Sequence, residues 1–284
     1  MIDNSIIKDI TTDVERAFYA SNKKTFINCT IDGPLDGESA FKESKNIVVS
    51  NCNFVLRYPF WHNTNLTIKD SIQQETCRAA IWYSKNILIE TSKLNGIKVL
   101  RECKNIEINQ SDIDSKECFW MCKNVNIKDS NIISEYPFFK SSDLTLERIH
   151  LTGKYSFQYC NNVVIKDSYL DTKDAFWETK NVTVYNSVIK GEYLAWYSKD
   201  LHLINCTIIG TQPLCYCKGL ILENCKMIDC DLSFEYSEVN ATIIGKIDSI
   251  KNPLKGQITY DECGEIIEDE NFKNEGIIIN KRVV

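Results

Sequence analysis

All five tryptophans of the chain occupy one position of a repeating pattern, and their rings could bind a ligand. They are Trp61, Trp82, Trp120, Trp177 and Trp196. Each of them directly follows an apolar residue, so strand alternation directs the indoles outward from the core. Arg101 stands at the same repeat position between Trp82 and Trp120, where cation–π contact is expected. The column predicts a face that binds an extended, saccharide-like or anionic ligand.

A row of outward indoles has a second interpretation, which is burial against another surface. Soluble monomers seldom leave a large apolar patch bare, and aromatic residues are enriched in protein interfaces. The covering surface would be the C-terminal segment or a second copy of the chain. Because Arg101 and Gln158 interrupt the apolar column, we expect the face to be at least partly open, in a monomer or a homodimer.

Arginine is scarce in this chain, yet Arg57, Arg78 and Arg101 recur in successive repeats near the N-terminal end of the aromatic column. Asp36 and Glu38 lie on a neighbouring loop. Guanidinium groups form paired hydrogen bonds with carboxylate or phosphate, so this group of residues is expected to converge on such a ligand. The residues predicted to bind ligand are Glu38, Arg57, Trp61, Arg78, Trp82, Tyr83, Arg101, Trp120, Trp177 and Trp196.

Acid–base chemistry is a further hypothesis for the same region. Glu43 and His62 fall at equivalent positions of neighbouring repeats, about 5 Å apart at strand spacing, and Glu102 shares their column. A histidine beside a carboxylate can move protons, so these three are the candidate catalytic residues of a polysaccharide-acting hydrolase or lyase. The competing interpretation is an ion-pair network between repeats. Asp174 and Glu178 also share one repeat, but no spacing fixes their separation at a glycosidase distance.

The 13 cysteines form an odd and unusually large set. The first residues lack the basic and apolar segments of a signal peptide, so we expect free thiols in a reducing cytoplasm rather than disulfides. Cysteines such as Cys52 and Cys122 share repeat positions with serines such as Ser111 and Ser141, which is typical of small buried positions. No Cys-x-x-Cys pair and no Cys–His grouping occurs, so neither a metal nor a cofactor is expected.

A repeat of 19 residues organises most of the sequence. The pattern Lys-Asn-apolar-x-apolar, or a close variant, begins at residues 85, 104, 123, 142, 161, 180, 199 and 218, after less regular copies at 45 and 64. Within each repeat the apolar residues alternate with period 2, which indicates short strands. Such units cannot bury their apolar faces alone, so they must stack as coils of a parallel β-helix.

Two columns of the repeat support this interpretation. An inner column contains Phe41, Phe60, Phe119, Phe138, Phe157 and Phe176. A second column is almost entirely asparagine, from Asn46 to Asn181. Because asparagine tolerates left-handed backbone and can bond the residues above and below it, this column predicts a repeated corner with a ladder of amides.

The sequence thus predicts one all-β domain over residues 1–284, a right-handed parallel β-helix with about eleven coils of 19–21 residues. Residues 1–22 are expected to form an N-terminal cap, with a short helix from Asp13 to about Phe18 that opens with a Thr12–Glu15 capping box. Residues 23–256 are the repeat coils. Residues 257–284 are expected to be irregular C-terminal strands that act as an acidic cap.

Composition excludes several partners. The chain has 33 basic and 39 acidic residues and a net charge of −6, without a basic stripe, so nucleic-acid binding is not expected. No run of 18 apolar residues exists, so no membrane-spanning helix is predicted. The expected partner is an oligosaccharide or an anionic small molecule, and the expected location is the cytoplasm.

Several strings are specific enough to indicate a family. RYPFWH, RAAIWYSKN, GIKVLRECKNI and GEYLAWYS resemble the bacterial family called domain of unknown function 3737, over essentially the whole chain. The resemblance implies a parallel β-helix with no assigned activity, and it supplies no catalytic residues. Similarity to pectin-acting β-helix enzymes is one of fold only and implies no shared function.

Overall fold

The computed structural model describes residues 5–32 and 38–282. These residues form a right-handed parallel β-solenoid of about fourteen turns, with no helix. The all-β class, the parallel pairing and the right hand predicted from the sequence are therefore confirmed. The chain divides into two compact units, residues 1–145 and 146–284, and the boundary falls within β20 (Ser142–Glu147). The expectation of a single domain stays a prediction.

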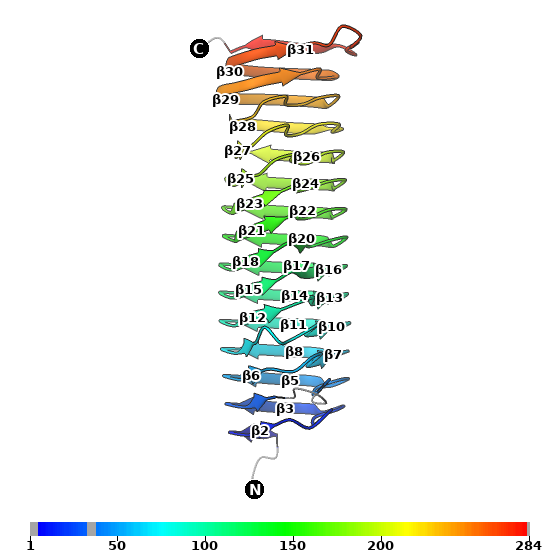
Figure 1. Cartoon of the computed structure of the whole chain (residues 1–284), viewed down its shortest axis with the longest axis vertical. Coiled ribbons are helices and arrows are strands. Elements are labelled where there is room, and N and C mark those ends of the chain that lie inside the picture. Colours follow the sequence, from blue (N-terminus) through cyan, green and yellow to red (C-terminus); the bar gives the residue numbers. More distant parts are fainter. Residues whose placement is uncertain (1–4, 33–37, 283–284) are drawn as a thin grey trace. The chain divides into compact units, whose positions relative to one another are not determined.

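Unit 1, residues 1–145, has three strand faces (Figure 1). The first face contains β1 (Ile6–Lys8), β3 (Asn22–Ile27), β5 (Lys45–Ser50), β8 (Thr64–Lys69), β11 (Lys85–Glu90), β14 (Lys104–Asn109) and β17 (Lys123–Lys128). The second contains β2 (Thr11–Thr12), β4 (Thr30–Ile31), β6 (Asn53–Phe54), β9 (Ile72–Gln73), β12 (Lys93–Gly96), β15 (Asp112–Ser115) and β18 (Asn131–Ser134). The third contains β7 (Phe60–Trp61), β10 (Ile81–Trp82), β13 (Val99–Arg101), β16 (Glu117–Trp120) and β19 (Tyr136–Pro137).

Unit 2, residues 146–284, continues the same pattern with longer strands toward its C-terminal end. Its first face contains β22 (Asn161–Lys166), β24 (Lys180–Tyr185), β26 (Lys199–Ile204), β28 (Leu220–Ile228), β29 (Glu238–Lys251), β30 (Lys255–Ile267) and β31 (Ile277–Lys281). Its second face contains β21 (His150–Lys154), β23 (Tyr169–Lys173), β25 (Val188–Lys190) and β27 (Thr207–Ile209). Each strand pairs in parallel register with its equivalent one coil later, as Val182 does with Leu201.

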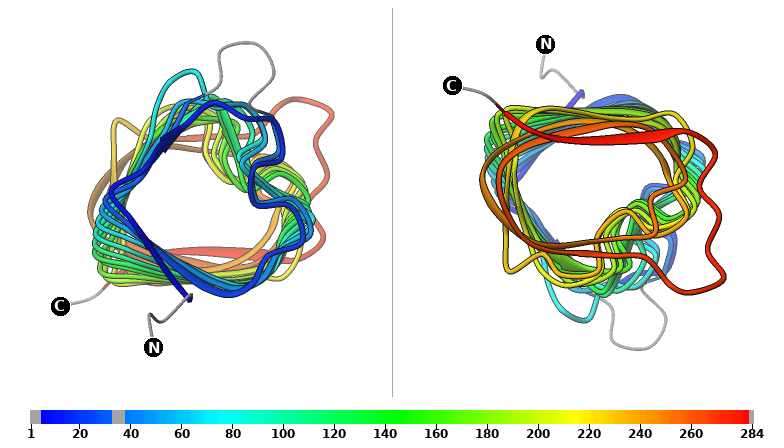
Figure 2. Two further views of the ribbon diagram at one scale, coloured as in Figure 1. Left: turned by 90° about the horizontal axis from the view of Figure 1, so that it is seen from below. Right: turned by 90° about the horizontal axis from the view of Figure 1, so that it is seen from above.

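The predicted aromatic column fills the core. In unit 1, Phe41 and Phe60 are fully buried and stack with ring centroids 5.2 Å apart. In unit 2, Phe157 and Phe176 are fully buried and stack at 4.8 Å. Viewed along the coils, the strands of each unit overlie one another (Figure 2). A strict repeat length therefore brings equal positions of successive repeats into contact.

The asparagine ladder is also confirmed. The Nδ2 group of Asn105 donates to the Oδ1 atom of Asn86 at 2.8 Å, and the Nδ2 group of Asn124 donates to that of Asn105 at 3.0 Å. In unit 2, Asn181 donates to Asn162 in the same way. The ladder residues adopt left-handed backbone, with φ of 56° at Asn105. Asparagine therefore supplies both the corner conformation and the bond between coils.

Replacing one ladder asparagine gives a first testable prediction. Asn105→Ala removes two amide hydrogen bonds and places alanine in left-handed backbone, so we expect it to lower the free energy of unfolding by about 1–2 kcal/mol. Asn105→Gly should cost less, because glycine adopts this conformation without strain. Urea denaturation followed by circular dichroism measures both variants. Equal losses in the two variants would contradict the backbone part of the argument.

Serine and cysteine interchange because they make the same contacts. The Sγ atom of Cys52 lies 3.3 Å from the carbonyl oxygen of Ser50, and the Oγ atom of Ser71 donates to the carbonyl oxygen of Lys69 at 2.6 Å. The backbone N–H of Cys52 donates to the Oγ atom of Ser71 on the next coil at 3.0 Å. None of the 13 cysteines, all of which lie within the described residues, forms a disulfide, and all but Cys263 are buried. These thiols therefore occupy structural positions between the coils.

The predicted N-terminal helix is wrong. Arg16 and Ala20 have φ of 53°, which a right-handed helix cannot accommodate. The backbone N–H groups of Arg16 and Phe18 donate instead to the carbonyl oxygens of Glu38 and Ala40, on the next coil. The N–H of Val14, not that of Glu15, contacts the Oγ1 atom of Thr12, at 3.3 Å. Hydrogen bonds between coils therefore form here in place of the helix that the capping signal predicts.

The predicted number of coils is too small. The segment expected to be an N-terminal cap already forms a coil, in which Ile6 pairs with Thr25. At the other end, β29 pairs in parallel with β30 from Glu238 and Lys255 onward, and β31 pairs with β30. These strands lack the Lys-Asn corner but keep parallel pairing, so coils continue where the sequence repeat fades.

Candidate functional site

The third face of unit 1 places the predicted aromatic column on its outer side. Trp61 pairs in register with Trp82, Trp82 with Arg101, and Arg101 with Trp120. The residues just before them, such as Phe60 and Ile81, are fully buried, so the column points outward. Each indole is half-buried. We call the column the cation–aromatic ladder; it consists of Lys42, Trp61, Trp82, Arg101, Trp120 and Phe139.

Ladder members cover one another's ring faces. Trp61 and Trp82 stack with centroids 5.8 Å apart and planes 11° apart, and the Nζ atom of Lys42 lies 5.0 Å from the Trp61 ring. The guanidinium of Arg101 lies 5.1 Å from the Trp82 ring and 5.3 Å from the Trp120 ring. Trp120 contacts Phe139 at 5.1 Å on its other side. A ligand can therefore contact the ring edges and the guanidinium of this ladder, but not open indole faces.

The indole N–H groups divide the tryptophans into two classes. Trp120 donates to the carbonyl oxygen of Tyr136 at 2.7 Å, and in unit 2 Trp177 and Trp196 make the same type of bond at 2.8 Å. The Nε1 atoms of Trp61 and Trp82 and the Nε atom of Arg101 are buried without a hydrogen-bond partner among the described atoms. A buried unsatisfied donor costs about 1–3 kcal/mol. Such costs are expected where function, rather than stability, selects the residues.

A second outward column follows the ladder directly and contains the candidate catalytic residues. Glu43 and His62 occupy adjacent coils, because the N–H of Glu43 donates to the carbonyl oxygen of Trp61 at 2.8 Å. His62 stacks on Tyr83 at 5.0 Å, and Glu43 accepts a bond from the Tyr19 hydroxyl at 3.1 Å. No Glu43–His62 ion pair occurs among the described residues. The acid–base hypothesis stays a prediction.

The predicted arginine cluster is brought together only in part. Arg57 forms an ion pair with Glu38, and the Nε atom of Arg101 lies 3.7 Å from the carboxylate of Glu102. Arg78 is exposed and pairs through its backbone with Ile97. No side-chain contact joins Arg78 to Glu38, Arg57 or Arg101 within the described ranges. Asp36, also expected there, lies outside the described residues.

A row of lysines beside the ladder was not predicted from the sequence. Lys85, Lys104 and Lys123 pair in register on successive strands of the first face, and all three are exposed. Lys123 lies 3.7 Å from Asp143, whereas Lys85 and Lys104 have no ion-pair partner in the part of unit 1 that the structure describes. Like charges opposite each other destabilise a sheet. The signal was present in the Lys-Asn pair that opens each of these three repeats.

Unit 2 contains an aromatic ladder without arginine. Trp177 and Trp196 stack at 5.6 Å with planes 1° apart. Tyr197 and Tyr216 stack at 4.8 Å, and Tyr216 stacks on Tyr236 at 5.8 Å. Tyr197 and Tyr236 keep 48% and 43% of their surface exposed. The two tryptophans predicted to bind ligand here therefore lack the cation that unit 1 supplies.

A known protein family matches this chain along most of its length. The model of a family described as protein of unknown function (DUF3737) matches residues 5–280. The chain belongs to this family. The match spans nearly the whole chain and confirms the resemblance found in its sequence. No curated protein sequence matches the chain.

Two solved structures are similar in architecture. The Streptococcus pneumoniae surface protein and adhesin PfbA has 9% identity and a TM-score of 0.45, and the match covers 98% of this chain and 92% of PfbA. The A-module of Azotobacter vinelandii mannuronan C-5 epimerase AlgE6 has 11% identity and a TM-score of 0.32, with 94% and 76% covered. Similarity at this level identifies no functional residue.

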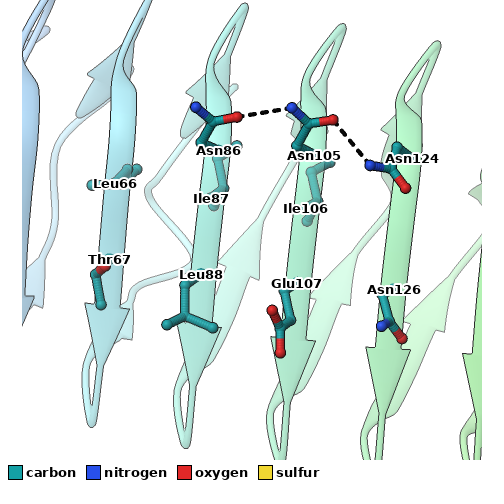
Figure 3. A pocket seen from close by; sticks show the side chains of 10 residues that line it. All are labelled: Leu66, Thr67, Asn86, Ile87, Leu88, Asn105, Ile106, Glu107, Asn124 and Asn126. Atoms are coloured by element: carbon teal, nitrogen blue, oxygen red, sulfur yellow. Dashed lines mark hydrogen bonds between the residues drawn. The ribbon is translucent and has the colours of Figure 1, made fainter.

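Unit 1 also has a surface groove in addition to the ladder. A shallow groove of about 380 Å³ lies on the outer side of β8, β11, β14 and β17, between the asparagine ladder and the row Thr67, Leu88, Glu107 and Asn126 (Figure 3). The asparagine column predicts a corner, and no sequence pattern predicts the groove. Within residues 5–32 and 38–282, no three His, Cys, Asp or Glu side chains are grouped to hold a metal ion. No described helix could cross a membrane.

Proposed function

We propose that this protein binds an extended anionic ligand, such as an acidic oligosaccharide, along the cation–aromatic ladder of unit 1. One observation supports this function above all: Arg101 is held between Trp82 and Trp120 while its charge is poorly paired. Glu102, at 3.7 Å, is too far for a charge-assisted hydrogen bond. Two indoles fix the plane of the guanidinium, and its in-plane N–H groups suit a carboxylate or phosphate.

The surroundings of Arg101 favour a repeating ligand. Lys104 follows three residues after Arg101, and Lys85 follows three residues after Trp82, on neighbouring coils. The lysines therefore repeat at strand spacing, about 4.8 Å. His62 and Tyr83 add exposed polar groups between the ladder and the lysines. A chain of acidic sugars lying along the coils would offset the repulsion between neighbouring lysines.

Binding is tested by tryptophan fluorescence with tetragalacturonate as the acidic probe and maltotetraose as the neutral one. We expect saturable binding of tetragalacturonate and a fluorescence change with that probe alone. Arg101→Gln should weaken its affinity by about 10-fold or more, because a charge-assisted bond contributes about 1.5–3 kcal/mol. Arg101→Lys should recover only part of this loss, since lysine keeps the charge without the planar fork.

Arg16→Gln is the matched control, because Arg16 is exposed, pairs only locally with Glu15 and lies outside the ladder. It should bind tetragalacturonate as the wild type does. Equal responses to the two sugars, or unchanged affinity in Arg101→Gln, would overturn the proposal. The wild type could also turn over the bound acidic sugar, and Glu43→Gln or His62→Ala could lose this turnover while affinity is kept. That result would identify the site as the active site of a hydrolase or lyase.

A second candidate function is assembly, and the exposed tyrosines of unit 2 favour it. Tyr197 and Tyr236 present large ring surfaces, and tyrosine is enriched in protein interfaces. If this face joins two copies, light scattering should give a dimer for the wild type. A Tyr197→Ser, Tyr236→Ser double variant should then be a folded monomer. A monomeric wild type would eliminate this function.

A further inference from the structure

Unit 2 contains a second surface groove, of about 270 Å³, that none of the sequence predictions includes. It lies on the outer side of β28, β29 and β30. Ile221 pairs in register with Asn240, Asn240 with Gln257, and Thr242 with Thr259. The floor of the groove is thus built from three consecutive coils whose outward residues are mainly amides and hydroxyls.

A histidine–carboxylate pair stands at one end of this groove. Glu223 lines it, and the Nε2 atom of His202 lies 2.8 Å from the Oε1 atom of Glu223. His202 pairs in register with Ile221, so it occupies the coil next to the groove. The structure therefore holds the imidazole of His202 against a carboxylate. This bond orients the ring and leaves its other nitrogen available to a ligand.

The amide and hydroxyl side chains of the groove are available for hydrogen bonds to a ligand. Asn240, Thr242, Gln257 and Thr259 make no side-chain hydrogen bond within the described part of unit 2. The groove of unit 1 differs in this respect, because its Asn86 and Asn105 amides bond each other. Free amides and hydroxyls can each donate and accept, which matches the hydroxyl groups of a sugar. No lysine or arginine lines the groove, so nothing there selects an anion.

We infer that this groove binds a neutral, polyhydroxylated ligand, an uncharged oligosaccharide, with the His202–Glu223 pair holding one of its hydroxyls. Glu223 accepts a hydrogen bond from that hydroxyl, or it orients the imidazole of His202, which then accepts the bond. Asn240, Thr242, Gln257 and Thr259 bond the sugars that follow along the coils. This groove belongs to unit 2 and would bind an uncharged ligand, whereas the cation–aromatic ladder belongs to unit 1 and would bind an anion. The inference therefore does not depend on the proposed function.

Nuclear magnetic resonance of the imidazole groups tests the inference directly, because the chain has only three histidines. The probes are maltotetraose, cellotetraose and mannotetraose, each titrated to millimolar concentration. We expect one of them to shift the His202 signals saturably and to leave those of His150 unchanged. No tryptophan lines this groove, so tryptophan fluorescence should stay constant. The absence of a His202 shift with all three sugars would overturn the inference.

Variants separate a binding site from a passive surface. Asn240→Ala and Thr242→Ala should each weaken the affinity for that sugar about 2–10-fold, as expected for loss of one hydrogen bond. Glu223→Gln keeps a bond to His202 but removes the charge, and it should weaken binding further. Thr183→Ala is the matched control, since Thr183 pairs with His202 on the side away from the groove. Equal losses in Thr183→Ala would contradict a site at the groove.

Discussion

Phe176→Ala is expected to destabilise the protein by about 3–5 kcal/mol, because the cavity it leaves in a stacked core cannot close. Phe176 is fully buried and stacks on Phe157 at 4.8 Å with ring planes 6° apart. Its backbone has a φ of 59°, in the left-handed region, which strains alanine as it strains phenylalanine. The substitution therefore relieves no backbone strain that could hide the loss of stability. Urea denaturation of the wild type and the variant, followed by circular dichroism, measures the difference.

The column itself provides the control. Leu214 fills an equivalent buried position in unit 2, so Phe176→Leu keeps most of the volume in a shape that this core already accepts. We expect Phe176→Leu to cost less than about 1.5 kcal/mol. A similar loss for leucine and alanine would show that ring stacking, rather than buried volume, stabilises the column.

The fold could be predicted because each position of the repeat has one environment. Phe60, Asn105 and Ser111 each belong to a column whose members share burial and partners, and the structure gives those columns the expected roles. A period of 19 residues with alternating apolar positions leaves few architectures other than stacked coils. The sequence therefore predicts class, pairing and core more securely than it predicts either end of the chain.

The ends of the chain differ from the sequence prediction because only local signals are available there. Thr12 and Glu15 match a capping box, but their neighbours Arg16 and Ala20 adopt positive φ and bond to the next coil. Helix signals contribute about 1 kcal/mol each, and pairing along a whole coil exceeds that. Beyond residue 237 the Lys-Asn corner disappears, although β29 and β30 still pair.

The candidate site was only partly predictable because columns reveal neighbours at equal positions and nothing else. They placed Arg101 between Trp82 and Trp120, which the structure shows. They could not show that the ring faces cover one another, since that depends on side-chain rotation. Nor could they reveal His202 and Glu223, which occupy different positions of neighbouring repeats and meet diagonally at 2.8 Å.

Loss of stability above pH 9 is the other large effect that we expect, because buried thiols resist ionisation. Burial raises the pKa of Cys77, Cys118 and Cys230 to about 12, from an ordinary value of 9.0. Below pH 9 the folded and unfolded chains both hold these protons. Between pH 9 and 12 only the folded chain does, so the free energy of unfolding falls by about 1.4 kcal/mol per pH unit for each thiol. Urea denaturation in reductant, from about pH 8 to about pH 11, follows this loss.

Cys217→Ser isolates the contribution of one thiol to this slope. Burial raises the pKa of Cys217 to about 11, and Ser198 and Ser237 contact it from the adjacent coils, so serine fits the same ladder. Serine does not ionise in this range, and the variant should therefore lose stability less steeply, by about 1.4 kcal/mol per pH unit between pH 9 and 11. Ser237→Ala is the control: it removes a hydroxyl from the same ladder but no ionisable group, so it should lower stability equally at every pH. If the slope for Cys217→Ser matches that of the wild type, surface lysines and tyrosines, rather than buried thiols, drive alkaline unfolding.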